Sequence, residues 1–238
     1  MSAYPPDFLL ARLLYRDGLM LVVDKPAGLP VHAGPGGGEN LEMYFDALRF
    51  GLPQPPSLAH RLDRDTSGCL ILGRHRKALA RLGRLFEQNR IEKTYWAVCA
   101  GAPAAPSGTI EAPLEKEMSP TGWRMIVSDK GQRAVTTYRT LSSAGGLSFI
   151  EAKPKTGRTH QIRVHLASVG APIVGDDRYG EDSDESRRRP MMLHARRVVV
   201  PISANKEPVV VEAPPPEAMA AMLAEKFGFR ESGGAPSG

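Results

Sequence analysis

The sequence predicts a single α+β domain built around a mostly antiparallel sheet, and three observations support this fold class. Short segments that alternate apolar and polar residues, separated by turn-rich pieces, fill residues 108–153, a pattern typical of antiparallel strands. Helical periodicity is present in three other segments, at 77–89, 159–170 and 217–227. No internal repeat and no linker divides the chain, so one domain is expected to span residues 1–230.

The strands expected outside this stretch are short and apolar. The segment "GLMLVVDKPAGLPV" indicates a strand at 19–23 that ends in a Lys-Pro-Ala-Gly turn. The run "CLILG" at 69–73 is typical of a buried strand, and "KTYWAVCAG" at 93–101 is rich in residues with high β-propensity. Two further strands, within 193–202 and 207–216, are expected to close the sheet.

The predicted helices have an apolar face or recognisable ends. The helix at 77–89 places its leucines on one face and its arginines on the others. In the next helix, Thr159 is a candidate N-cap, and Gly170 followed by a proline ends the helix. Asn40 is expected to cap a further helix that runs through Leu48.

The amino-acid composition is that of a soluble globular protein, with 42% hydrophobic and 24% charged residues. No apolar run approaches the roughly 20 residues needed to cross a bilayer, and the first residues lack the pattern of a secretory signal. Cys69 and Cys99 lie in apolar, strand-like runs, so we expect buried free thiols and no disulfide framework. We therefore expect a cytoplasmic protein with no membrane partner and, by default, a monomer.

Basic residues are concentrated in three clusters, at 74–93, 153–163 and 187–197, in a chain of formal net charge +5. Any one cluster is compatible with a solvated helix face or loop, but together they flank the most unusual motifs of the chain. This distribution predicts a polyanionic partner. The glycine-rich segment "HAGPGGGEN" does not match the phosphate-binding GxxxxGK[ST] pattern, so we expect a mobile loop beside a site.

The stretch "HRLDRDTSG", residues 60–68, places two aspartates and two arginines directly before a buried strand. A carboxylate in that position is costly unless it is paired or hydrogen-bonded. In one interpretation, Asp63 or Asp65 caps a turn whose hydroxyls and backbone N–H groups come from residues 66–68. In the other, Asp63 faces a pocket as a nucleophile or general base that an arginine keeps ionised.

A second polar motif, "TGRTHQIR", has arginines on both sides of His160 and Gln161 at the start of a helix, where an anion binds favourably. His160 and His165 are five residues apart and fall on different helix faces, which argues against a metal pair. No metal site is therefore expected. Tyr95 is the third candidate, either as a core residue or as a ring that stacks on a flipped base.

Four motifs, "HRLDRDTSG", "EKTYWAV", "KTGRTHQIRVHLASVGAPIVGDDRYG" and "MLHARRVVV", in this order and spacing, resemble the RluA-type family of pseudouridine synthases over roughly residues 19–211. The resemblance implies a mixed, largely antiparallel central sheet with flanking helices and a central RNA-binding cleft. It implies isomerisation of uridine in RNA without cofactor or metal: the N1–C1′ bond breaks, the uracil rotates, and C5 bonds to C1′. The family's essential aspartate maps to Asp63, which either attacks C1′ or removes the 2′ proton to give a glycal.

The resemblance also implies roles for residues around this aspartate. Arg61 is expected to flip and hold the target nucleotide, and Tyr95 to stack on the uracil. Leu193 is expected to line the pocket. The basic partner of the aspartate maps to Arg163, with Arg158 as the alternative.

The expected partner is RNA, either ribosomal, transfer or both. Only about 18 residues precede the first expected strand, so we expect no N-terminal S4-type module and a catalytic domain that selects its own RNA. RNA contacts are expected from the glycine-rich loop and from a set of polar and basic residues: His60, Arg64, Arg158, His160, Gln161, Arg187, Arg188 and Arg189. Residues 231–238 are expected to be a disordered tail.

Two other function classes are alternatives to this one. An RNA-binding protein or chaperone with the same fold would not need Asp63, Tyr95 and Arg163 together. A carboxylate glycosidase would need a second carboxylate about 5–10 Å from the first, and Asp65 is the local candidate. An Asp63→Asn variant that binds RNA without activity would favour the synthase over the binding protein.

Overall fold

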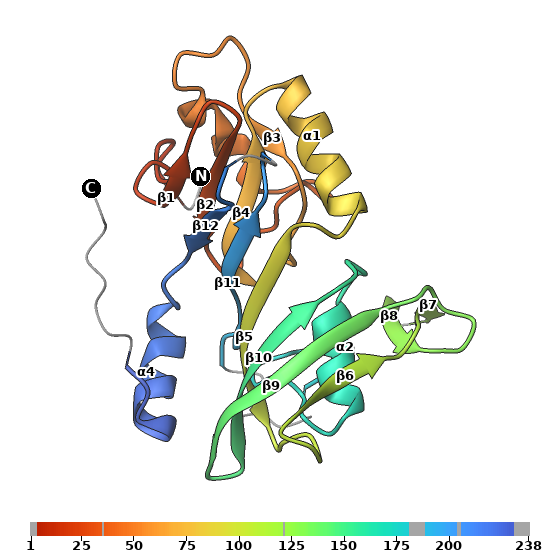
Figure 1. Ribbon diagram of the computed structural model, residues 1–238. Helices are drawn as coiled ribbons and strands as arrows, with labels where there is room; N and C mark the ends of the chain where they lie inside the picture. The colour runs from red at the N-terminus through yellow and green to blue at the C-terminus, as the bar shows by residue number, and fades with distance from the viewer. Residues whose placement is uncertain (1–3, 35, 121, 181–188, 204–205, 231–238) are drawn as a thin grey trace.

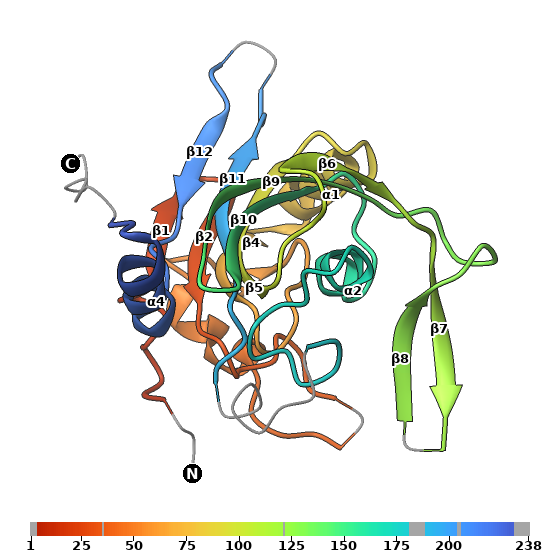
Figure 2. The same cartoon turned by 90° about the horizontal axis from the view of Figure 1, so that it is seen from below.

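The structure, a computed structural model, describes residues 4–34, 36–120, 122–180, 189–203 and 206–230. A ten-stranded sheet runs through the described part of the molecule, with helices and a separate two-stranded hairpin around it (Figures 1 and 2). The elements are β1 Leu13–Arg16, β2 Met20–Lys25, the 3₁₀ helix η1 Leu41–Leu48, β3 Ser57–Leu58, β4 Ser67–Gly73, α1 Arg76–Glu87, β5 Glu92–Ala100, β6 Ser107–Glu111, β7 Leu114–Ser119, β8 Gly122–Val127, β9 Val135–Ala144, β10 Leu147–Pro154, α2 Gln161–Ser168, β11 Leu193–Val200, β12 Val209–Glu212 and α4 Glu217–Phe227.

The strand order of the large sheet is β1-β2-β4-β11-β5-β10-β9-β6, with β12 beside β11 and β3 beside β4. β4 and β11 pair in parallel, and the other pairings in this sheet are antiparallel. The prediction of a mixed, largely antiparallel sheet with flanking helices is therefore confirmed. β7 and β8 form the separate hairpin, and α2 lies between this hairpin and the sheet (Figure 2).

β4 is buried along its whole length because both faces of the sheet are covered at this point. Leu70 and Leu72 belong to the core on one face, whereas Cys69 and Ile71 belong to the core on the other. This double burial explains why "CLILG" is uninterrupted by polar residues. Cys69 and Cys99 are both buried and free, as predicted. No described helix has the length and hydrophobicity to span a membrane.

The helices agree with the sequence patterns in position but not in every cap. α4 spans 217–227 as predicted and ends at Gly228, whose φ of 64° is left-handed. α1 begins one residue earlier than predicted, because the His75 ring accepts a hydrogen bond from the Ala78 N–H. It ends two residues earlier, before Asn89, whose φ of 53° is incompatible with a continuing helix.

Two predicted N-caps are wrong. The residue before α2 is His160, in the left-handed region at φ 53°, so Thr159 does not cap this helix. The Gln161 side chain instead accepts a hydrogen bond from the Arg158 N–H and closes the preceding turn. Asn40 does precede η1, but its amide donates to the Gly38 carbonyl and leaves the helix end without a side-chain cap.

Gly68 is required where β4 meets β11. It pairs with Ala195, its φ is +105°, and an added Cβ would lie 2.3 Å from the Ala195 carbonyl oxygen. We expect Gly68→Ala to lower the free energy of unfolding by about 3 kcal/mol or more, measured by urea denaturation, because backbone strain and overlap add. The control is Gly83→Ala in α1, where a Cβ meets nothing within 4 Å; it should stabilise by about 0.5–1 kcal/mol. Equal effects would contradict this account.

His194 is buried at the same junction and is neutral. Its Nδ1 lies 2.8 Å from the Ser67 hydroxyl and its Nε2 lies 3.1 Å from the Ala213 carbonyl. Because the carbonyl can only accept, Nε2 carries the proton and Nδ1 accepts from Ser67. Burial lowers the pKa of His194 to about 4.

Acid should therefore destabilise the fold through this histidine. The pKa of His194 is lower in the folded state than its usual value of 6.5, so between pH 6.5 and 4 the unfolded chain binds the extra proton. Stability present above pH 6.5 is then lost as the pH falls, by about 2 kcal/mol between pH 7 and pH 5. Urea denaturation at both pH values should show a smaller loss for His194→Gln. His32→Gln, an exposed control, should keep the wild-type loss.

Candidate active site

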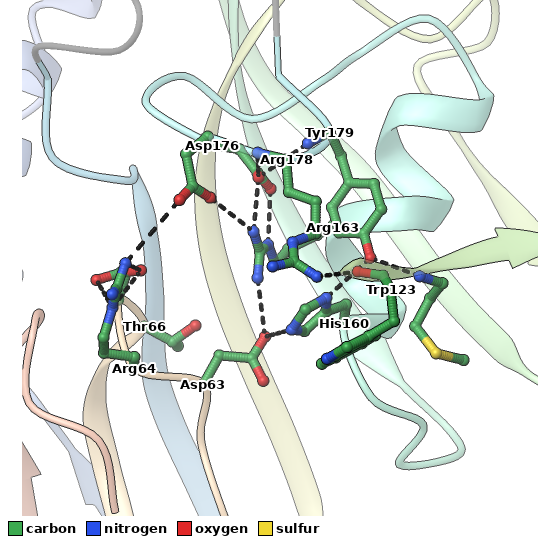
Figure 3. Close-up of polar contacts among 12 residues, drawn as sticks. Asp63, Arg64, Thr66, Trp123, His160, Arg163, Asp176, Arg178 and Tyr179 are labelled. Atoms are coloured by element: carbon green, nitrogen blue, oxygen red, sulfur yellow. Dashed lines mark hydrogen bonds and ion pairs between the residues drawn. The ribbon is translucent and has the colours of Figure 1, made fainter. Parts of the chain in front are cut away.

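Asp63 lies in the loop between β3 and β4, at the first position of a tight turn. The Thr66 N–H donates to the Asp63 carbonyl over 3.2 Å, so the turn interpretation is right for the backbone. Arg64 and Asp65 form a side-chain pair beside the turn, with Nη2 and Oδ2 2.9 Å apart. The Asp63 carboxylate itself points the other way, toward α2 (Figure 3).

Lys25 fixes the position of this loop. It is completely buried at the end of β2, and its ammonium donates to the carbonyls of Pro26, Arg64 and Thr66 over 2.8–2.9 Å. Burial lowers the pKa of Lys25 to about 7, while nearby carboxylates including Asp63 oppose the shift. The three carbonyl acceptors use the three N–H bonds of an ammonium, so the loop that carries Asp63 is tied to the sheet by one buried cation.

Arg163, on the first turn of α2, is the cation beside Asp63. Its Nη1 lies 3.6 Å from Asp63 Oδ2. Its Nε and Nη2 each donate to a carboxylate oxygen of Asp176 over 2.7 Å, in a bidentate pair. Arg163 is 5% exposed and the Asp176 side chain is completely buried. Asp176 therefore holds the guanidinium in a fixed orientation with one nitrogen directed at Asp63 (Figure 3).

The charges of this cluster support one another. Burial alone would lower the pKa of Arg163, but the hydrogen bonds and charge of Asp176, together with the charge of Asp63, outweigh burial and raise it. Burial alone would raise the pKa of Asp176, but Arg163 and the N–H groups of Arg178 and Tyr179 outweigh burial and lower it. Arg163 and Asp176 are thus both charged at neutral pH.

His160 is the second group that faces the carboxylate. Its Nε2 lies 3.9 Å from Asp63 Oδ2, and its Nδ1 lies 2.8 Å from the Tyr179 hydroxyl. That hydroxyl accepts from the Met125 N–H in β8, so its own proton is available to donate to Nδ1. Burial lowers the pKa of His160 to about 4, so the ring is neutral at pH 7. This arrangement favours the tautomer with the proton on Nε2, facing Asp63.

The β7–β8 hairpin covers the other side of His160. The Trp123 ring stacks on the imidazole with centroids 5.2 Å apart and an interplanar angle of 23°. The guanidinium carbon of Arg178 and the ammonium of Lys116 each lie 4.9 Å from the Trp123 centroid. The hairpin is therefore attached to the site through a ring stack and the Tyr179 hydrogen bond (Figure 3).

A pocket of about 490 Å³ opens in front of Asp63. Tyr95 and Leu193, which are 9% and 3% exposed, contribute to its wall from β5 and β11. Burial first, and then the charge of Asp63, raise the pKa of Tyr95, so its hydroxyl stays protonated. Residues proposed from the sequence that line this pocket are His60, Arg61, Asp63, Tyr95, Arg158, His160, Gln161, Arg163 and Leu193.

Arg158 and Gln161 have other partners within the protein. Arg158 Nε donates to the Arg133 carbonyl over 3.2 Å. Of the two arginines considered as the partner of Asp63, it is Arg163 that lies beside the carboxylate. The Gln161 amide oxygen accepts two hydrogen bonds and its nitrogen donates two, over 2.7–3.0 Å. The Gln161 amide therefore already holds the turn before α2 in place. RNA contacts by these residues stay predictions.

Of the other residues expected to contact RNA, His60 lines the pocket and Arg64 does not. The His60 ring accepts from the Ile71 N–H and lies 4.9 Å from the Phe86 ring, centroid to centroid. The exposed Arg64 pairs with Asp65. Of the 187–189 cluster, Arg187 and Arg188 lie outside the described residues, as does the tail at 231–238. None of the described residues in the glycine-rich loop lines the pocket.

Sequence reasoning missed four residues of this site: Lys25, Trp123, Asp176 and Tyr179. Asp176 could have been found, because a buried arginine needs a buried carboxylate and "PIVGDDRYG" places one after an apolar run. The sequence predicts only a turn at Lys25. Trp123 carried no local signal, since its contact with His160 joins residues far apart in the chain. Among the described residues, no group of three or more His, Cys, Asp or Glu is arranged to hold a metal ion.

Comparison with known proteins places this chain in a family. The profile of the RNA pseudouridylate synthase family matches residues 19–168. An uncharacterized RNA pseudouridine synthase of Zymomonas mobilis is 47% identical over 212 residues, covering 88% of this chain and 96% of that protein. Ribosomal large subunit pseudouridine synthase C of Haemophilus ducreyi is 36% identical over 210 residues, covering 85% of this chain and 65% of that protein.

Comparison with solved structures points to the same family. The solved structure of human RNA pseudouridylate synthase domain containing 4 superposes with a TM-score of 0.77 at 27% identity, covering 92% of this chain and 94% of that one. Profile, relatives and fold agree, and the chain belongs to the RluA-type family of RNA pseudouridine synthases, isomerases that convert uridine in RNA to pseudouridine.

Proposed function

We propose that the chain isomerises uridines in structured RNA, ribosomal or transfer, with Asp63 as the catalytic group. The observation that carries this assignment is the Asp63 carboxylate, 3.6 Å from Arg163 Nη1 at the wall of a pocket of about 490 Å³. Uridine and pseudouridine have the same atoms and oxidation state, so the reaction needs no redox cofactor. We propose that it also proceeds without a metal ion.

Asp63 acts on the ribose in one of two ways. Either its carboxylate attacks C1′ while the N1–C1′ bond breaks, or it removes the 2′ proton to leave a glycal. In both cases the uracil rotates and C5 bonds to C1′. In the first route the bond between Asp63 and C1′ breaks as C5 attacks, and in the second Asp63 returns its proton to C2′. The C5 proton then leaves and N1 gains a proton. Arg163, fixed by Asp176, holds the carboxylate in the orientation that either route requires.

The pocket wall supports the roles of the neighbouring residues. Tyr95 presents a protonated aromatic side chain next to Asp63, suitable for stacking on the uracil, and Leu193 adds apolar surface. Arg61 is exposed at the pocket and, among the residues that the structure describes, takes no part in the ion pairs around Arg163, so we assign it to the flipped nucleotide. Flipping costs a few kcal/mol, least in loops, and contacts to phosphates offset that cost.

We propose a monomeric enzyme of the cytoplasm. Its two cysteines are buried free thiols, which suits a reducing compartment. The relatives named for the large ribosomal subunit support ribosomal RNA as a substrate, and transfer RNA is retained as the other candidate.

Tritium release from RNA labelled at uracil C5 tests this function. Wild-type protein is incubated separately with total transfer RNA and ribosomal RNA, and Asp63→Ala serves as the inactive control. Release from either RNA by the wild type alone would establish the reaction and its substrate class. Tight, salt-sensitive binding without release from either RNA would contradict the proposed substrates, and release by the variant would remove Asp63 from the catalytic role.

A further inference from the structure

The pocket extends beyond the cluster around Asp63 to a second end, formed by the C-terminal end of α1 and the start of β5. Phe86, Glu87, Asn89 and Lys93 line this part. Lys93 lies two residues before Tyr95 on β5, so both side chains lie on the same face of the strand, about 6.6 Å apart along it. A ligand that contacts Tyr95 is therefore within reach of Lys93.

The Lys93 ammonium faces an aromatic ring. It lies 5.9 Å from the centroid of the Phe86 ring. Burial lowers the pKa of Lys93. Burial first, and then the charge of Lys93, lower the pKa of the neighbouring His60 to about 3, so that ring is neutral.

Lys93 has no counter-ion within the part of the chain that the structure describes. No carboxylate there lies within ion-pair distance of its ammonium, and this includes Glu87, which lines the same part of the pocket. A partly buried cation without a partner is destabilising, and such groups are typical of sites that receive an opposite charge from a ligand. Arg163 differs because Asp176 already neutralises it.

We propose that Lys93 binds a phosphate of the RNA strand next to the nucleotide held over Asp63. This inference rests on the proposed function, because it assumes that RNA enters the pocket. A compact ammonium suits a phosphate as a point charge. The helix α1, whose C-terminal end lines this part of the pocket, also carries exposed basic residues that would favour a nearby RNA strand: Arg76, Lys77, Arg81 and Arg84.

Binding of hexauridylate tests this site without depending on catalysis. Its unpaired bases can enter the pocket without the cost of opening a duplex. Affinity is measured by fluorescence anisotropy at several salt concentrations for the wild type, Lys93→Met and Lys93→Arg. Lys226→Met, the same change on α4, is the matched control. A second probe is hexauridylate with neutral methylphosphonate linkages.

For Lys93→Met, the slope of log K against log salt should be smaller in magnitude by about 0.7, the value for one phosphate contact on a single strand. Lys93→Arg should restore the slope, and Lys226→Met should not change it. On the neutral oligomer, wild type and Lys93→Met should bind equally. The melting temperature of Lys93→Met should be unchanged or higher, since a desolvated charge is removed.

An unchanged slope in folded Lys93→Met would overturn the proposal. A loss of affinity that persists on the neutral oligomer would also overturn it, because Lys93 would then contact a base or act through the fold. The slope effect without tritium release from any RNA would leave the phosphate site intact and refute the proposed reaction instead. The two proposals therefore fail separately.

Discussion

Asp63→Asn should abolish pseudouridine formation while the protein stays folded. An asparagine amide has nearly the same shape but can neither attack C1′ nor accept the 2′ proton, so both routes stop. We expect the rate to fall on the order of 10⁴-fold or more. The measurement is single-turnover tritium release on whichever RNA the wild type modifies.

Measurements of stability and RNA binding should show that Asp63→Asn loses activity without damage to the fold. Arg163 keeps its bidentate pair with Asp176 when the Asp63 charge is removed, so the melting temperature should change little. Asp65→Asn is the matched control, two residues away in the same turn and paired with the exposed Arg64. It should keep most of the activity. Loss of activity in Asp65→Asn alone would contradict the assignment of Asp63.

Arg163→Met should remove both activity and stability. The Asp176 carboxylate, completely buried, would lose its two 2.7 Å hydrogen bonds from the guanidinium and keep only those from the N–H groups of Arg178 and Tyr179. Breaking a buried pair by removing one partner typically costs about 3–5 kcal/mol. Urea denaturation measures this loss. Arg163→Lys should lose less stability but not recover the geometry, because an ammonium cannot form the bidentate pair.

A double variant distinguishes a role of Arg163 in positioning Asp63 from a role in stabilising the fold. Arg163→Met with Asp176→Leu removes both buried charges, so it should be more stable than Arg163→Met. It should remain inactive, because no cation then lies beside Asp63. Recovery of activity together with stability would show that Arg163 acts only through the fold.

Local patterns were sufficient for most of the secondary structure. The uninterrupted "CLILG" predicts a buried strand, and the alternation after residue 108 predicts the antiparallel strands that the structure contains. α4 was found at its observed limits because its periodicity and Gly228 are both local signals. The Thr159 cap was wrong because tertiary contacts hold His160, the residue before α2, in the left-handed region.

Only part of the active site could be predicted from local sequence patterns. The motif around Asp63 indicated a carboxylate that needs a partner, and the family resemblance mapped that partner to Arg163. Neither source revealed that Asp176 orients the arginine, that Lys25 fixes the loop, or that Trp123 covers His160. These contacts join residues from separate elements, and their side chains meet only when the sheet and hairpin are assembled.

The chain's own pattern of residues thus determined the fold class, the strands and the chemistry that the motifs can perform. These properties depend on short-range periodicity, turn residues and residue type, which are present in any local window. The tertiary structure alone established the parallel β4–β11 junction, the orientation of Arg163 and the position of Lys93 in the wall of the pocket. Each depends on burial and on contacts across long sequence separations, which no local pattern encodes.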